Sequence, residues 1–218
     1  MTTVVMITPS TFGGSVSGTP SGTVYAPGPS ATVTVQQEDV ATLAALGFVA
    51  EVSVGFMNLP LTSALSAAGV PITATPTGGA FGVTQTLGTS TVLKTEAAKS
   101  STVTDVASFG VTLPASFPAG EDLTLTATAI LVPGASTVTT KTVDASAYLM
   151  ASDGTSSADL VTTAAQTISA SSGDYSFTIA GDTLTPGAVL MVSTTMVITE
   201  TVNAAAAYGN LTGLKISA

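Results

Sequence analysis

The sequence contains no cysteine, no histidine and no tryptophan among its 218 residues. Without cysteine there are no disulfides and no thiolate nucleophiles, and without histidine the commonest general base and the usual zinc ligand sets are missing. A Ser-His-Asp triad cannot be assembled within one chain. Much enzyme chemistry is therefore excluded. Because a chain without cysteine suits oxidising and reducing compartments alike, this absence indicates no compartment.

Charge is scarce, and positive charge is scarcest. Charged residues form 8% of the chain, whereas about 25% is usual for a globular domain. The four basic residues are lysines at positions 94, 99, 141 and 215, against 13 acidic residues, so the net charge is −9. Sequence-independent binding to DNA or RNA requires neutralisation of phosphates. Four scattered lysines in an acidic chain therefore predict no nucleic-acid partner.

Long apolar runs are also absent, although 45% of the residues are apolar. Uninterrupted apolar segments are only a few residues long, far short of the roughly 20 that span a bilayer. The N-terminal segment MTTVVMITPSTF has no basic residue before its apolar part, which is not typical of a signal peptide. We therefore expect no membrane partner.

Threonine, serine, alanine, glycine and valine fill the chain instead. Threonine and valine are β-branched and favour strands. A surface built of hydroxyl groups can be buried against a partner without leaving an unpaired charge. The composition thus favours large contacts between subunits, and a compositional habit of the lineage explains it equally well.

The clearest pattern lies in residues 175–202, YSFTIAGDTLTPGAVLMVSTTMVITETV. Its first part alternates apolar and polar residues from Tyr175 to Ile179, Gly181-Asp182 and Pro186-Gly187 mark turns, and its second part again places apolar residues on one face. We predict a hairpin of two half-buried strands. The second strand could reach about 45 Å at roughly 3.3 Å per residue.

Alternation continues throughout residues 102–218. Leu123, Leu125 and Ala127 alternate with threonines, and similar patterns cover residues 138–150 and 211–216. About seven or eight antiparallel strands separated by turns are typical of a two-sheet sandwich. We therefore predict a mainly β protein whose C-terminal domain, 102–218, is an antiparallel β-sandwich, with a jelly roll as the leading topology.

The N-terminal part is predicted to be small and mixed. Residues 1–30 are rich in Gly, Pro and Ser, and indicate an extended arm that lies along a neighbour, or a terminus that is simply disordered. Residues 31–72 predict a small α+β unit, in which a strand precedes a helix that ends at Gly47, with Phe48 folding back on the last turn as in a Schellman motif. Residues 73–101 are predicted to be a linker.

Residues that could carry chemistry are few. Asp153 and Asp159 flank a Ser/Thr loop, but their spacing matches no standard calcium loop. Lys99 adjoins Ser100 without a supporting motif, and Glu121 with Asp122 fits a turn. We therefore predict no catalytic residues, no metal site, no cofactor and no enzymatic activity.

Two segments carry a resemblance to a known family. One is DVATLAALGF, residues 39–48, where a helix ends in Gly-Phe, and the other is the stretch GDTLTPGAVLMV. Together with the Gly/Pro-rich start and the Thr-rich sandwich pattern, the chain resembles the head decoration, cement and head-fibre proteins of tailed bacteriophages. In that family, small proteins with β-sandwich or jelly-roll domains, often trimers, sit on the outer capsid and stabilise it.

The resemblance implies a structural virion protein on the capsid surface, assembled in the host cytoplasm. Its implied partners are the major capsid protein and further copies of itself in a homotrimer, and a contact with host-surface glycans stays open. Residues 31–72 would anchor the chain to the capsid. The expected interface residues are apolar and lie in the strand and helix of that segment: Val33, Val35, Val40, Leu43, Leu46 and Phe48.

Three alternatives remain at this point. A tail, baseplate or fibre component would use the same kind of surface. A cell-surface adhesive β-sandwich module would require a signal peptide, which residues 1–7 do not provide. An enzyme would need an unusual Ser-Lys or carboxylate site.

Overall fold

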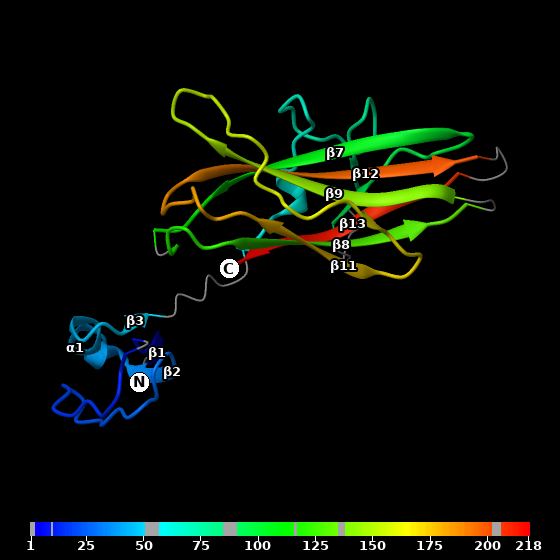
Figure 1. Cartoon of the computed structure of the whole chain (residues 1–218). Helices are drawn as coiled ribbons and strands as arrows, with labels where there is room; N and C mark the ends of the chain where they lie inside the picture. The colour runs from blue at the N-terminus through cyan, green and yellow to red at the C-terminus, as the bar shows by residue number, and fades with distance from the viewer. Residues whose placement is uncertain are drawn as a thin grey trace. The chain divides into compact units, whose positions relative to one another are not determined.

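In the computed structural model the chain folds into two compact units, Met1–Ser53 and Val54–Ala218 (Figure 1). The structure describes residues 3–9, 11–50, 57–84, 91–115, 117–134, 138–201 and 206–218. This division differs from the predicted boundaries after residues 30, 72 and 101. The pairing of the strands explains each difference.

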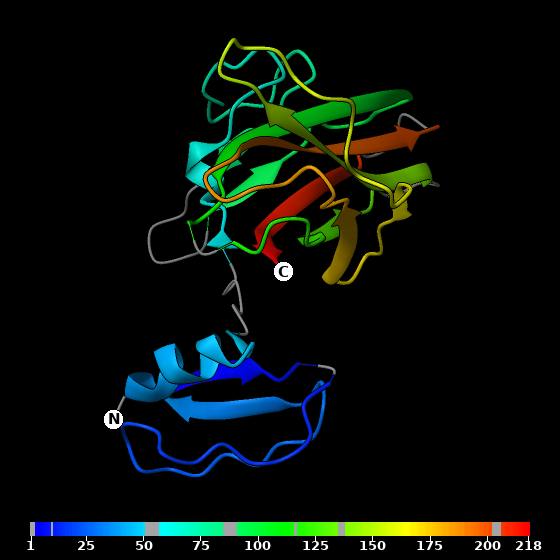
Figure 2. The same ribbon diagram turned by 60° about the vertical axis from the view of Figure 1, so that its left-hand side comes forward.

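The first unit is a three-stranded antiparallel sheet with one short helix. Its strands are β1 (Thr3–Ile7), β2 (Thr32–Gln36) and β3 (Val49–Ala50), in the order β2-β1-β3. A 3-10 turn, η1 (Gln37–Asp39), leads into α1 (Val40–Ala45), which lies across one side of β1 and β2 (Figure 2). Met6, Val35 and Leu43 from these elements meet in its core. The predicted strand-helix packing is therefore present.

The end of α1 has the predicted Schellman geometry. Gly47 has φ 85°, in the left-handed region that glycine tolerates best. Its N–H donates to the carbonyl oxygen of Ala44 at 3.0 Å, and the N–H of Phe48 donates to that of Leu43 at 3.1 Å. These two hydrogen bonds satisfy carbonyl groups that the end of a helix leaves free.

The prediction of an extended arm over residues 1–30 is wrong. β1 is the central strand of the first sheet, paired with β2 along its whole length. Val16 and Tyr25, in the Gly/Ser-rich loop that follows, pair with each other and are buried. The loop is held by partners distant in sequence, which local composition does not reveal.

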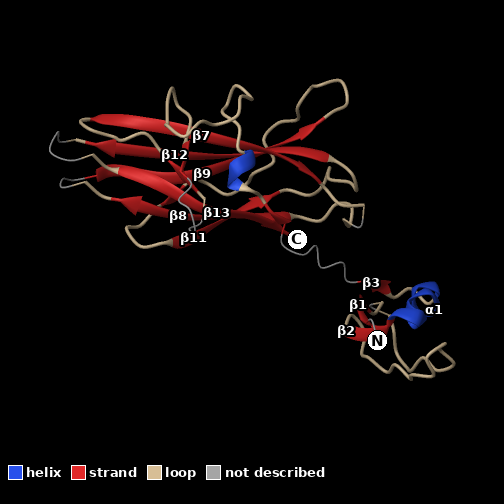
Figure 3. Cartoon of the chain, turned by 180° about the vertical axis from the view of Figure 1, so that it is seen from behind, coloured by secondary structure: helices blue, strands red, loops and turns tan. Residues whose placement is uncertain are grey.

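The second unit consists of two facing antiparallel sheets (Figure 3). One has the order β10-β9-β12-β7, and the other has the order β11-β8-β13-β6-β5, with β4 also paired to β13. The bounds are β4 (Met57–Asn58), β5 (Gly82–Thr84), β6 (Val92–Lys94), β7 (Ser101–Thr112), β8 (Leu123–Val132), β9 (Val138–Met150), β10 (Gln166–Thr167), β11 (Gly173–Ile179), β12 (Val189–Glu200) and β13 (Tyr208–Ser217). A 3-10 turn, η2 (Leu61–Ser63), precedes β5.

The strand pairing is that of a jelly roll. β6 pairs with β13, β7 with β12, β8 with β11 and β9 with β10, all antiparallel. These pairs are nested, so the chain from β6 to β13 is one long hairpin wrapped into two sheets. The alternating side chains that point between the sheets, such as Leu125, Phe177 and Leu190, are fully buried. The predicted antiparallel β-sandwich with jelly-roll topology is confirmed.

Two local predictions in this unit are wrong. β11 and β12 do not form a hairpin, because β11 pairs with β8 in one sheet and β12 lies between β9 and β7 in the other. The stretch 73–101 is no linker, since it contributes β5 and β6 to the larger sheet. β5 and β6 are three residues each, too short to produce a readable alternation.

Candidate functional site

The six predicted interface residues belong mostly to the core of the first unit. Val35, Leu43 and Phe48 are buried, with exposed fractions of 1%, 0% and 2%. Val33 and Val40 are partly buried and pack against the same cluster. Leu46, beside the end of α1, is 51% exposed. Of the predicted set, Leu46 is therefore the residue that presents an apolar side chain to solvent.

Asp39 organises the first unit around a buried carboxylate. Its Oδ1 accepts the N–H of Ser21 at 2.8 Å, and its Oδ2 accepts the hydroxyl groups of Ser21 and of Tyr25, the latter at 2.7 Å. The Tyr25 hydroxyl oxygen accepts the N–H of Gln36 at 3.0 Å. Burial raises the pKa of Asp39, but the hydrogen bonds from Ser21 and Tyr25 outweigh it, and the pKa lies below its usual value of 3.8.

The outer face of the four-stranded sheet is broad and almost uncharged. Its strands β9, β12 and β7 pair in register, so the outward side chains form six rows of three. The rows are Thr140–Thr199–Thr102, Thr142–Val197–Thr104, Asp144–Thr195–Val106, Ser146–Ser193–Ser108, Tyr148–Met191–Gly110 and Met150–Val189–Thr112. Asp144 is the one charged side chain among them. This face is called the β12 face below.

The outer face of the other sheet is rich in hydroxyl groups. Over β8 and β11, Thr124 lies opposite Thr178 and Thr126 opposite Ser176. Lys215 Nζ lies 3.9 Å from a carboxylate oxygen of Asp174, and Lys94 Nζ lies 3.7 Å from the centre of the Tyr208 ring. Both broad faces of the jelly roll therefore carry few charges that would be uncompensated on contact with another surface, namely Asp144 on one and Lys94 on the other.

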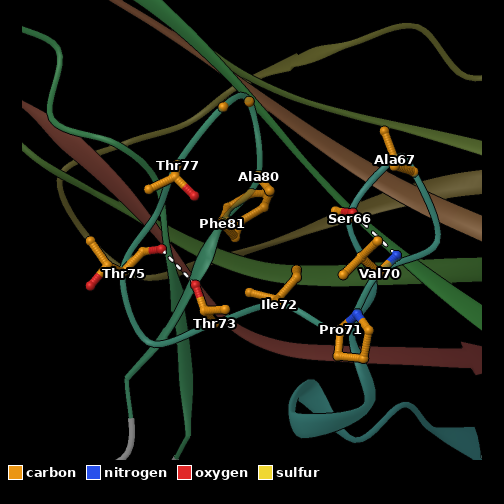
Figure 4. A pocket seen from close by; sticks show the side chains of 13 residues that line it. Ser66, Ala67, Val70, Pro71, Ile72, Thr73, Thr75, Thr77, Ala80 and Phe81 are labelled. Carbon is orange, nitrogen blue, oxygen red and sulfur yellow. Dashed lines mark hydrogen bonds between the residues drawn. The ribbon is translucent and has the colours of Figure 1, made fainter.

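A pocket of about 320 Å³ opens between two loops that lead from η2 to β5 (Figure 4). Four hydroxyl side chains line it, from Ser66, Thr73, Thr75 and Thr77. Its apolar lining includes Ile72, Phe81 and Val70, which is 57% exposed. Among the residues that the structure describes, no charged side chain lines this pocket. Its volume is near the lower limit of roughly 300–1,000 Å³ for small-molecule sites, and its chemistry suits an uncharged, hydroxylated group.

The loops of this pocket are fixed to the sandwich through two acidic residues. The N–H of Gly78 donates to Oε1 of Glu96 at 3.1 Å, and the N–H of Glu96 donates to Oδ2 of Asp105 at 2.5 Å. Asp105 is fully buried on β7, and its Oδ1 has no hydrogen-bond partner. Burial raises the pKa of Asp105, the hydrogen bond from Glu96 lowers it, the charge of Glu96 raises it, and the net change is upward from 3.8.

Replacing Asp105 with asparagine is expected to stabilise the second unit at pH 7 by about 1 kcal/mol or more, because a buried charge is removed while an acceptor for the N–H of Glu96 remains. Because the pKa of Asp105 is raised in the folded state, its protonated form favours folding. This contribution to stability is fully present below pH 3.8 and is lost as pH rises through the folded-state pKa. The stabilisation that Asp105→Asn provides should therefore become smaller as the pH is lowered. Urea unfolding of the full chain between pH 4 and 8 measures it.

The matched control is Asp182→Asn, at an exposed position in the loop before β12. It should change the free energy of unfolding by less than about 0.5 kcal/mol at any pH in the range. If Asp105→Asn behaves like this control, or destabilises the chain at pH 7, the assignment of an unfavourable buried charge is incorrect.

The other acidic candidates have structural partners. Asp153 Oδ1 accepts the N–H and the hydroxyl group of Thr155 at 2.9 and 2.7 Å, and these bonds lower the pKa of Asp153. Asp159 Oδ1 accepts the N–H groups of Ala147 and Val161. Asp122 Oδ1 accepts the N–H of Gly181 at 2.7 Å. Each of these carboxylates fixes a loop.

Within the described residues, no group of three or more Asp and Glu side chains is placed to hold a metal ion. The helices that the structure describes are all too short or too polar to cross a membrane.

Comparisons with known proteins give limited similarity. No protein-family model and no curated protein matches the sequence. Among solved structures, the CBM22-1 xylan-binding domain of Xyn10C from Paenibacillus barcinonensis aligns with a TM-score of 0.39 at 16% identity, over 74% of this chain and 92% of that domain. A chain from the structure of the infectious bursal disease virus Gt strain aligns with a TM-score of 0.37 at 14% identity, over 100% of this chain and 51% of that one.

Proposed function

We propose that this chain is a structural virion protein that binds the outer surface of a bacteriophage capsid as a decoration or cement protein and stabilises the head. The observation that carries the proposal is the chemistry of the two broad jelly-roll faces. One has Asp144 as its single charge over eighteen outward positions, and on the other Asp174 lies near Lys215 and Lys94 lies over the ring of Tyr208. Such surfaces suit repeated contacts in an assembly, where many weak contacts add up.

The first unit supplies the contact with the major capsid protein in this proposal. It holds no lysine or arginine, because the first basic residue of the chain is Lys94. Its exposed apolar side chains include Leu46 and Val24, with exposed fractions of 51% and 59%. Leu46 belongs to the segment in which the sequence resembles phage decoration proteins. We therefore assign Leu46 to the contact with the capsid.

Replacing Leu46 with aspartate is expected to weaken binding to the capsid at least tenfold, because a carboxylate would be buried against the shell without a partner. The measurement is co-sedimentation of the purified chain with capsids that lack it. The matched control is Val24→Asp, which changes a second exposed apolar residue of the unit and should bind like the unmodified chain. Equal binding by all three proteins would overturn the assignment of Leu46, and no binding by any would overturn the function.

A second candidate function is that of an adhesive module at a cell surface or on a phage fibre. The loop pocket favours it, since the described residues that line its cavity of about 320 Å³ supply four hydroxyl groups and no charged side chain. Backbone and hydroxyl groups of this kind fit an uncharged sugar. Screening the chain against an array of neutral glycans, with Thr75→Val as a variant of the pocket, tests this candidate. Specific binding that the variant loses would favour it over capsid decoration.

A further inference from the structure

We propose that copies of this chain associate with one another through the β12 face. The inference deepens the proposed function, from which it takes the expectation that several copies act together. It names the contact surface and the partner, which is a second copy of this chain. The supporting observations are the apolar side chains on this face, the occupied edges of its sheet, and the charge and size of the face.

One end of the β12 face is apolar and exposed. Val189, the first residue of β12, is 43% exposed. Met150 lies beside it in the same row, Met191 and Tyr148 lie in the adjoining row, and all three are partly exposed. Gly110 completes the row of Met191, and a Cβ atom built there would meet no atom within 4 Å. This end of the face therefore presents apolar side chains beside open space.

Both edges of this sheet are covered in part by the chain itself. On β7, the N–H and carbonyl groups of Ser108 bond to Leu65, and the N–H of Val106 donates to the carbonyl oxygen of Gly79. At the free edge of β9, strand β10 and the loop before it form backbone hydrogen bonds, for example from the N–H groups of Ser157 and Leu160. Partly covered edges disfavour strand-to-strand pairing between copies. The face of the sheet is left for contact.

Charge favours a second copy as the occupant. Every copy carries a net charge of −9, so copies repel each other unless they meet where carboxylates are few. Along β12 itself the outward side chains are all uncharged, from Val189 to Thr199. With Asp144 as its one charged side chain, the face gives little recognition to a strongly basic or acidic partner.

The size of the face is sufficient. β12 has 12 residues, so it is about 40 Å long, and three strands at about 4.8 Å spacing make the face roughly 14 Å wide. Each copy would thus contribute an area of roughly 570 Å², and two copies together roughly 1,100 Å². A biological interface is expected to bury more than about 1,000 Å² in total.

The test starts from the mass of the unmodified chain in solution, measured by light scattering after size-exclusion chromatography over a range of concentrations. A mass above one chain is expected. Met191→Lys should raise the dissociation constant at least about 100-fold, because an ammonium group would be buried without a counter-charge. Thr124→Lys, on the outer face of the other sheet, is the matched control and should associate normally. An unmodified chain that stays monomeric, or a Met191→Lys protein that associates like the control, overturns the inference.

A second measurement holds even if Met191→Lys fails to fold. Because the chain has no cysteine, single spin labels can be attached at Thr195→Cys on the β12 face and at Thr124→Cys on the opposite face. Sheets within a sandwich are about 10 Å apart, so labels on the far faces should be about 20 Å more distant between copies than labels on the contact face. A shorter distance for Thr124→Cys would overturn the inference. Neither experiment contains capsids, so the inference can fail while capsid binding stands.

Discussion

Replacing Gly181 with alanine is expected to destabilise the jelly-roll unit by about 3 kcal/mol or more. A Cβ atom at this position would lie 2.1 Å from the carbonyl oxygen of Glu121 and 2.6 Å from the backbone nitrogen of Asp122. The colliding atoms belong to the backbone, so no change of rotamer relieves the contact. The substitution must displace the loop before β12 and break the hydrogen bond from Gly181 N–H to Asp122. Urea unfolding measures the loss.

The matched control is Gly110→Ala in the same unit. Its Cβ atom would meet nothing within 4 Å, and alanine is less costly to order than glycine. The free energy of unfolding should therefore stay within about 0.5 kcal/mol of the original or rise slightly. If Gly181→Ala is as stable as Gly110→Ala, the loop between β11 and β12 does not dock on residues 121 and 122 as described.

Replacing Asp39 with alanine is expected to unfold the first unit while the second unit stays folded. Without the carboxylate, the N–H of Ser21 and the hydroxyl groups of Ser21 and Tyr25 lose their acceptor. The loop between β1 and β2 then has few interactions that hold it in place, and unpaired buried donors are costly. Limited proteolysis should cleave the chain within residues 1–53 and spare 54–218.

Glu38→Ala is the matched control, because Glu38 is the exposed neighbour of Asp39 on η1. It should resist protease like the original chain. Since the folded-state pKa of Asp39 is lowered, its contribution to stability is present above pH 3.8 and is lost as pH falls through the folded-state pKa. The original chain should become sensitive to an acid-active protease in the first unit below that pH, and protection that persists there would contradict the role of Asp39.

The sequence predicts the sandwich well where the two faces of a strand differ in polarity. Leu123, Leu125 and Ala127 point into the core while the threonines between them point outward, and this contrast identifies β8. The long stretch after Pro186-Gly187 likewise identifies β12. Gly47 and Phe48 identify the end of α1, because a Schellman motif depends on neighbouring residues alone.

Strand partners are predicted poorly, because alternation does not state which sheet a strand joins. The turn residues between β11 and β12 suggest a hairpin, yet the loop carries the chain from one sheet to the other. β6 gains its place by pairing with β13, and β5 by pairing with β6, each over only a few residues. β1 and the following loop are fixed by β2 and Asp39, which lie far along the chain.

The candidate surfaces could be predicted only in part. The predicted apolar set from Val33 to Phe48 follows a true periodicity, but periodicity marks the buried face of a helix, and most of the set fills the core of the first unit. The β12 face depends on the register of β9, β12 and β7, which no local pattern contains. Its signal in the sequence is the absence of charge from residues 189–199. The burial of Asp105 could not be predicted from the sequence, since it arises from packing between the sheets.

The most direct test of the proposed role is the thermal stability of phage heads measured by calorimetry, with and without the purified chain. Capsids that lack the chain should bind it saturably, and their disruption temperature should rise with its concentration until the sites are filled, because a ligand of the intact shell stabilises it by mass action. Heads that neither bind the chain nor change their disruption temperature would contradict capsid decoration.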